Sequence, residues 1–309
     1  MGTAISAESA PAARIWRPVR PLDLVRTLAP LQRGGADPTH RVIGRTVWHT
    51  AATPEGAATL RLSHHWGEVQ AMAWGPGAQC ALDSVPDLLG TRDDASDFDP
   101  GHPLLRNVHR RHPGLRLCRT GLVFAQVVPA VLEQKVTGLE SRRSWRELLL
   151  RFGDPAPGPA PSGMRVLPGA RRWLDLPDWE WHRAGVDLTR RRAIRAAATV
   201  ANRLDECGGL PPEQAVRRLK SVPGIGPWTT AEVAQRALGA ADAVSVGDYN
   251  IPSLVGWALT GSPVDDAGML ELLEEYRPHR HRVVRLIEVS GVRSPRHGAR
   301  APIRDYRRV

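Results

Sequence analysis

The chain has 309 residues, with 42 Lys or Arg against 32 Asp or Glu, and therefore a formal net charge of +10. Hydrophobic residues at 42% and charged residues at 24% are ordinary globular values, which excludes a fibrous or wholly disordered chain. The length suggests one large domain or two ordinary ones, and the positive charge raises the question of an anionic partner such as nucleic acid.

The cysteines exclude several classes of protein. There are three, far apart in the sequence, and this odd number without a Cys-x-x-Cys pair argues against a disulfide scaffold, a zinc finger and a four-cysteine iron–sulfur cluster: Cys80, Cys118 and Cys207. Residues 1–14 lack the apolar core of a signal peptide and are expected to be disordered. The longest apolar-rich stretch, 122–132, is too short to span a bilayer. We expect a cytoplasmic protein with no membrane contact.

Residues 15–90 are predicted to form a β-rich N-terminal domain. The segments 41–52, 58–66 and 68–75 carry β-branched and aromatic residues in partial alternation, broken by turn signals. The acidic, turn-rich segment 91–103 is expected to be a linker.

From Leu104 the apolar residues recur three and four positions apart, which predicts a helical domain over 104–290. The Pro/Gly-rich segment 154–169 interrupts it as a linker, and 291–309 is expected to be a basic, frayed tail. The predicted helices are 104–113, 121–136, 138–153, 189–206, 212–221, 229–238, 249–260, 266–275 and 280–290. The fold class is therefore α+β.

The most informative stretch is LKSVPGIGPWTTAEVAQRAL, residues 219–238. It predicts a helix ending near Ser221, a tight turn with Gly224 and Gly226, and a second helix that Thr229 or Thr230 caps. The main-chain N–H groups of such a hairpin can hold a phosphate without reading base sequence. The alternative is an ordinary corner between two helices with a glycine-rich turn.

Asp248 precedes the predicted helix 249–260 and follows Gly226 by 22 residues. One interpretation is a helix N-cap, in which the carboxylate accepts main-chain N–H groups. The other is a carboxylate held beside a cleft, because one helix plus a return loop would bring Asp248 back to the hairpin.

These residues resemble the helix–hairpin–helix DNA glycosylase superfamily, and most closely its 3-methyladenine DNA glycosylase II branch. The resemblance rests on 222–231 (VPGIGPWTTA) and on 246–249 (VGDY). Supporting elements are 124–137 (FAQVVPAVLEQKVT), 276–280 (YRPHR) and the strand-rich N-terminal part. It implies a DNA glycosylase fold in which the DNA cleft lies between two helical lobes.

The resemblance also implies the chemistry, which is base excision repair. Such enzymes flip a damaged nucleotide out of duplex DNA and cleave its N-glycosidic bond. Asp248 matches the family's catalytic Asp, which stabilises the oxocarbenium ion and orients or deprotonates the attacking water. We therefore expect a hydrolase that excises alkylated purines of the 3-methyladenine type and acts as a monomer, associated with the nucleoid in a bacterium. The alternative is a non-catalytic protein that binds damaged or distorted duplex.

Trp228 stands where bifunctional relatives carry the lysine that forms a Schiff base, and neither lysine of the chain, Lys135 or Lys220, occupies that position. Because lyase chemistry needs an amine, we expect a monofunctional glycosylase. The resemblance also places Trp228 in the base pocket, where its π face would stack on a cationic base. The alternative for Trp228 is a core residue that closes the hairpin.

The resemblance assigns further residues to the site. Glu232, Tyr249 and His279 would line the base pocket, although Glu232 replaces a Tyr and His279 replaces an aromatic residue of the best-known members. Gln134 and Lys135 lie in the element that fills the gap left by the flipped base, with a solvated lysine as the alternative for Lys135. No cofactor is expected to be required. The hairpin of this family binds a monovalent cation, Na⁺ or K⁺, through main-chain carbonyls, here those of Lys220, Val222 and Ile225.

Overall fold

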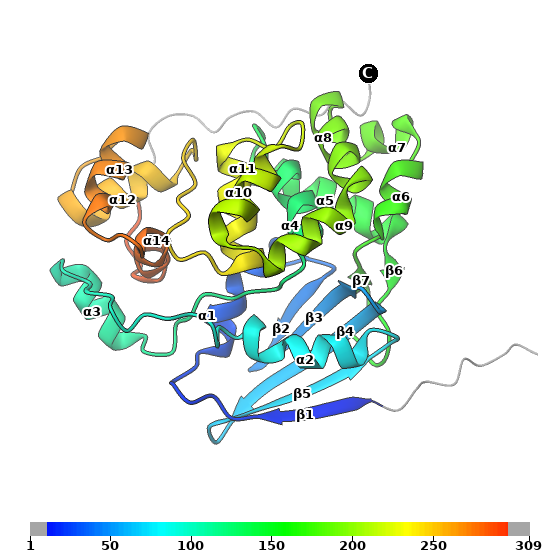
Figure 1. Cartoon of the computed structure of the whole chain (residues 1–309), viewed down its shortest axis with the longest axis horizontal. Coiled ribbons are helices and arrows are strands. Elements are labelled where there is room, and N and C mark those ends of the chain that lie inside the picture. The colour runs from blue at the N-terminus through cyan, green and yellow to red at the C-terminus, as the bar shows by residue number, and fades with distance from the viewer. Residues whose placement is uncertain (1–10, 296–309) are drawn as a thin grey trace, which may run out of the picture.

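The computed structural model describes residues 11–295. Figure 1 shows a β-sheet at one end of the molecule, with the helices layered above it. The chain begins in the sheet, passes through one helical lobe around α4 to α11, and ends in a second lobe around α12 to α14.

The N-terminal sheet is antiparallel, with the strand order β1-β5-β4-β3-β2. Leu60 and Leu62 of β4 pair with Ala73 and Ala71 of β5 and are buried, whereas Arg61 between them is exposed. This alternation places one face of the sheet against α2 (Ala78–Leu88). The strands are β1 (Ala12–Trp16), β2 (His40–Ile43), β3 (Thr46–Thr53), β4 (Gly56–His65) and β5 (Glu68–Trp74).

The structure corrects three expectations in this domain. Strand β1 begins at Ala12, inside the segment 1–14 that was expected to be disordered, because it pairs with β5. The predicted strand 41–52 is two strands, with a turn at Gly44, whose φ is +60°. The helices α1 (Leu24–Leu28) and α2 were missed, and in α2 an internal proline, Pro86, obscured the helical period.

The first helical lobe packs around a core that includes Trp173, Trp181 and Leu148. The predicted helices are present, and the short α6 and α7 were missed because each has only six residues. Its helices are α4 (Val123–Leu132), α5 (Gly138–Phe152), α6 (Ala170–Asp175), α7 (Asp178–Arg183), α8 (Leu188–Thr199), α9 (Ala201–Asp205), α10 (Pro212–Lys220) and α11 (Pro227–Val233), which continues as the π-helical turn η3 (Ala234–Leu238).

The second lobe has its own core, which includes Leu105, Val255, Met269 and Val284. It combines helices from two distant parts of the chain: α3, from the middle of the sequence, packs with the C-terminal helices, as Figure 1 shows. Its helices are α3 (Pro103–Arg111), α12 (Ile251–Thr260), α13 (Asp266–Glu274) and α14 (Arg280–Val289).

The expected linker at 154–169 joins the sheet to the first lobe. It contains the short strands β6 (Asp154–Pro155) and β7 (Arg165–Val166). The Arg165 N–H donates to the Pro38 carbonyl at 2.7 Å, and the Arg165 carbonyl accepts from the Thr50 hydroxyl at 2.7 Å. This segment is therefore bound to the sheet at both main-chain groups of one residue.

Several arginines of α14 are bound inside the protein. Arg282 forms a buried ion pair with Asp93, at 2.5 Å between Nη2 and Oδ1, and Arg280 pairs with Asp242 at 2.7 Å. The positive charge of this helix is thus largely compensated. The expected basic tail lies outside the described residues from 296 onward. Within residues 11–295, the helices are too short or too polar to cross a membrane.

Candidate active site

The loop of residues 221–226 connects α10 to α11 and forms the hairpin. Gly224 has φ +85°, and a Cβ there would lie 2.5 Å from the Ala193 Cβ of α8. Gly226 has an extended backbone, and in the described part of the chain no atom lies within 4 Å of where its Cβ would be. The first glycine is required by packing, whereas the second leaves the main chain open to an approaching ligand.

Helix α11 begins at Pro227, two residues before the predicted start, so the expected threonine N-cap is wrong. Proline is favoured at the first helical position because its missing N–H has no partner there anyway. The Thr229 and Thr230 side chains are buried instead, and the Thr230 hydroxyl donates to the Gly226 carbonyl at 2.9 Å. Both residues are therefore part of the packed interior of the hairpin rather than of its surface.

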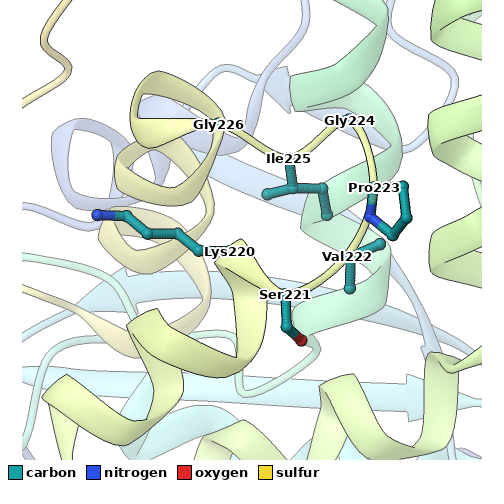
Figure 2. Close-up of a pocket in the computed structure, with 7 residues that line it drawn as sticks. All are labelled: Lys220, Ser221, Val222, Pro223, Gly224, Ile225 and Gly226. Carbon is teal, nitrogen blue, oxygen red and sulfur yellow. The ribbon is translucent and has the colours of Figure 1, made fainter.

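A pocket lies at the hairpin loop. Figure 2 shows that Ile225 points inward beneath the loop, where it is buried in the core, while Lys220 extends away from the loop. The Val222 carbonyl accepts the Ile225 N–H at 3.1 Å and keeps a second lone pair. Carbonyl oxygens suit a hard cation, and all three residues expected to bind one lie around the same pocket. It is lined by Lys220, Ser221, Val222, Pro223, Gly224, Ile225 and Gly226. Among residues 11–295 there is no cluster of His, Cys, Asp or Glu that could hold a metal ion.

Gln134 ties the end of α4 to the hairpin. Its side-chain amide Nε2 donates to the Gly224 carbonyl at 2.9 Å and to the Thr229 hydroxyl oxygen at 2.7 Å. The next residue, Lys135, is exposed and has φ +53°, an unusual conformation for a residue other than glycine. Thr137 then caps α5 in a capping box with Glu140. The element that the resemblance assigned to gap filling therefore lies directly against the hairpin.

Asp248 lies on the connection between the two helical lobes, just before α12. Its Oδ1 accepts the main-chain N–H groups of Asn250 at 2.8 Å and of Ile251 at 3.0 Å, and its Oδ2 accepts the indole Nε1–H of Trp228 at 3.1 Å. The carboxylate therefore accepts main-chain N–H groups at the start of α12, although the N-cap position is Asn250, two residues later than expected. Its other oxygen faces the first turn of α11, so Asp248 does return to the hairpin helix.

The remaining pocket residues lie in different environments. Tyr249, beside Asp248, is 91% exposed. Glu232 is buried, and its carboxylate binds Arg236 at 2.8 Å and the Ser245 hydroxyl at 2.5 Å. His279 is buried in the second lobe, where its Nε2 lies 2.8 Å from Asp97 Oδ1 and its ring meets Phe98 edge-on. The structure thus brings Trp228 and Asp248 together and leaves the Tyr249 side chain exposed, whereas Glu232 and His279 are occupied with partners within the protein.

The sequence patterns did not single out Gln235 and Ser245, which hold the loop before Asp248. Gln235 donates from Nε2 to the Ala243 carbonyl at 2.8 Å and to the Ser245 hydroxyl oxygen at 2.9 Å. The available signal was the spacing of 228, 232 and 235, which places three polar or aromatic side chains on one face of a helix.

No family model matches the chain. Curated relatives in two strains of Mycobacterium tuberculosis are called "Probable bifunctional transcriptional activator/DNA repair enzyme AlkA" and are 29% identical over 174 residues. The match covers 55% of this chain and 33% of the relative. The chain therefore spans about a third of the length of these relatives.

Solved structures resemble the chain over a larger part of its length. The 3-methyladenine DNA-glycosylase of Archaeoglobus fulgidus has a TM-score of 0.75 at 16% identity and covers 90% of this chain and 98% of its own. The 8-oxoguanine glycosylase/lyase of Clostridium acetobutylicum, in complex with double-stranded DNA, has a TM-score of 0.68 at 10% identity and covers 91% and 96%. Mag1 of Schizosaccharomyces pombe, a 3-methyladenine DNA glycosylase in complex with abasic DNA, has a TM-score of 0.51 at 15% identity and covers 64% and 97%. At these identities the likeness shows the fold.

Proposed function

We propose that this chain, which has the fold of the helix–hairpin–helix DNA glycosylases, is itself a DNA glycosylase that excises alkylated purines from duplex DNA. The observation that carries the proposal is the Asp248 carboxylate, held by three donors between the hairpin helix and the second lobe. A protein that only binds DNA has no use for an anion fixed so close to bound phosphate. The relative named as a DNA repair enzyme supports a role in repair, and the structural neighbour named as a 3-methyladenine DNA-glycosylase supports the choice of substrate.

Asp248 supplies the charge that the reaction needs. An alkylated purine carries positive charge and leaves with the electrons of the N-glycosidic bond, so that the sugar becomes an oxocarbenium ion. The half-buried carboxylate stabilises this cation and takes the proton of the water that adds to the sugar carbon. Its position is set before the substrate arrives, since both oxygens are already hydrogen-bonded to two different helices.

The hairpin binds the DNA backbone. Its open Gly226 lets a phosphate approach the main-chain amides, and Gln134 holds the loop in place. A monovalent cation bound by the carbonyls of Lys220, Val222 and Ile225 would add positive charge to this contact. The extruded base would meet the Trp228 indole, which is bonded to the carboxylate, and the exposed ring of Tyr249, the next residue in the chain.

The test is base release from alkylated duplex DNA by wild type and by Asp248→Asn. We expect release of 3-methyladenine-type bases by wild type and a loss of about 10²–10³ in rate in the variant, because one stabilising charge is removed. Asn has a single acceptor oxygen, which can keep the main-chain bonds at the start of α12 while its NH2 group faces the Trp228 N–H. Duplex binding should persist, because it relies on the main chain of the hairpin. Duplex binding without base release by wild type would favour the alternative, a non-catalytic protein that recognises damaged DNA. Equal release by Asp248→Asn would remove Asp248 from the reaction.

We further propose that the enzyme lacks lyase activity. The first turn of α11 presents Trp228, and its indole N–H is donated to Asp248. Because an indole is no nucleophile for a Schiff base, borohydride should trap no covalent complex between the protein and DNA that contains an abasic site. A trapped complex that disappears in Lys135→Ala or Lys220→Ala would contradict this proposal.

A further inference from the structure

One face of α11 and its continuation η3 binds the loop that leads to Asp248. We propose that Glu232, Gln235 and Ser245 are positioning residues that set the place of the Asp248 carboxylate. This inference rests on the proposed function, which assigns the reaction to Asp248, and it gives Glu232 a role other than contact with the base.

The contacts are made along a single helical face. Trp228 bonds to Asp248, Glu232 to Ser245 at 2.5 Å, and Gln235 to both Ser245 and the Ala243 carbonyl. The spacing of 228, 232 and 235 is that of one side of a helix. The helix therefore contacts the loop at its start (Ala243), its middle (Ser245) and its end (Asp248).

Ser245 connects the helix to the turn that carries the Asp248 carboxylate. The Asp248 N–H donates to the Ser245 carbonyl at 3.2 Å across a tight turn in which Gly247 has φ +89°. Ser245 is 1% exposed, and its hydroxyl donates to Glu232 while accepting from Gln235. Because the hydroxyl both donates and accepts a hydrogen bond, its orientation is fixed. Loss of this hydroxyl would free the turn that carries Asp248.

The charge of Glu232 connects these contacts to Arg236 on the same helix. Its carboxylate is buried, and Arg236, one turn further along, forms an ion pair that compensates its charge. Arg236 is held in turn by the Pro30 carbonyl of the N-terminal domain, which accepts from its Nε at 2.9 Å. A buried ion pair contributes little to stability compared with apolar packing, but it defines geometry. The network therefore runs from the N-terminal domain to the catalytic loop.

The experiment compares wild type with Ser245→Ala, which removes the hydroxyl and leaves the Glu232–Arg236 pair intact. Gln235→Leu is the second variant, and Ser84→Ala is the control, since Ser84 makes a similar bond to the Ala81 carbonyl in α2. Single-turnover base release, duplex affinity and thermal unfolding are measured for each. We expect base release to fall about tenfold in both site variants, with duplex affinity and the control unchanged, because misplacing a reacting group affects the chemical step.

A second readout does not depend on activity. The Trp228 indole N–H resonance, identified by its loss in Trp228→Phe, reports the bond to Asp248. We expect Ser245→Ala to shift this resonance and Ser84→Ala to leave it in place. A wild-type rate together with an unmoved resonance in folded Ser245→Ala would overturn the inference. If wild type releases no base, the proposed function fails, and the resonance alone then decides whether the loop is positioned in this way.

Discussion

At the scale of single residues, two glycines in one loop serve different purposes. Gly224 lies against Ala193 with a positive φ, so the fold itself requires it. Gly226 has an ordinary φ of −89° and open space where a side chain would be. No residue of the described range 11–295 therefore demands glycine at 226, and under the proposed function the open space is where the DNA backbone approaches.

The pair Gly224→Ala and Gly226→Ala separates the two purposes. We expect Gly224→Ala to lower the free energy of unfolding by about 2–4 kcal/mol, because it combines a left-handed backbone with a clash. Gly226→Ala should leave stability nearly unchanged and lower duplex affinity about tenfold for any base sequence, since a phosphate contact of about 1.5–3 kcal/mol is obstructed. Urea unfolding and fluorescence anisotropy measure these effects. Wild-type affinity of Gly226→Ala would place the hairpin outside the interface.

At the scale of elements, helix α11 contacts a different partner on each of two sides. Gln134 at the end of α4 fixes the hairpin and Thr229, while the face of 228, 232 and 235 holds the loop that carries Asp248. Seven residues followed by one π-helical turn are too short to be stable alone. The helix is therefore ordered by these contacts and by its place in the core.

Gln134→Ala tests the link between α4 and the hairpin. The variant leaves the Gly224 carbonyl and the Thr229 hydroxyl without this donor, which costs about 1 kcal/mol of local stability. We expect faster amide hydrogen exchange in residues 221–229, unchanged exchange in α12, and weaker duplex binding. The matched control is Gln79→Ala, whose side chain bonds Asp83 in α2. Unchanged exchange in the hairpin would show that the loop is rigid without Gln134.

At the scale of the whole molecule, the N-terminal domain is fastened to both ends of the site. Arg33 pairs with Glu133 beside Gln134 at 2.9 Å, Arg236 bonds Pro30, and Asp37 accepts the Trp145 indole N–H of α5 at 3.0 Å. Two histidines lie in the same region, His40 and His49, with their Nδ1 atoms 3.3 Å apart. Burial lowers the pKa of His40 to about 3, helped by His49, and lowers the pKa of His49 to about 4.

These pKa values predict that acid weakens the protein. The folded state keeps both histidines neutral, while the unfolded chain binds protons as the pH falls below about 6.5. Stability is therefore fully present above that pH and decreases below it, by about 1.4 kcal/mol per pH unit for each histidine. We expect the free energy of urea unfolding to decline from pH 6.5 to pH 5, with a shallower slope in His49→Leu. The exposed His65 of the same sheet is the control, and a wild-type slope in His49→Leu would contradict the assignment.

Local sequence determined the elements around the site. The period of the apolar residues placed most of the helices, and the glycine pattern with Asp248 predicted the hairpin and the return to it. The N-terminus of α11 was misplaced because Pro227 and Gly226 outweighed the threonines. The missed helices α1, α2, α6 and α7 either contain a proline or are too short for a period to show.

Tertiary structure decided how the side chains are used. No local pattern could show that the Asp248 carboxylate divides its oxygens between α12 and Trp228, that Glu232 also binds Ser245, or that His279 is bound by Asp97. Trp228, Ser245 and Asp97 are 13 to 182 positions from these partners, and only packing brings them together. By itself the sequence determined which backbone segments form the site, because turns and helices depend on neighbours along the chain. Which side chains face the substrate depended on burial, which the assembled lobes and sheet impose.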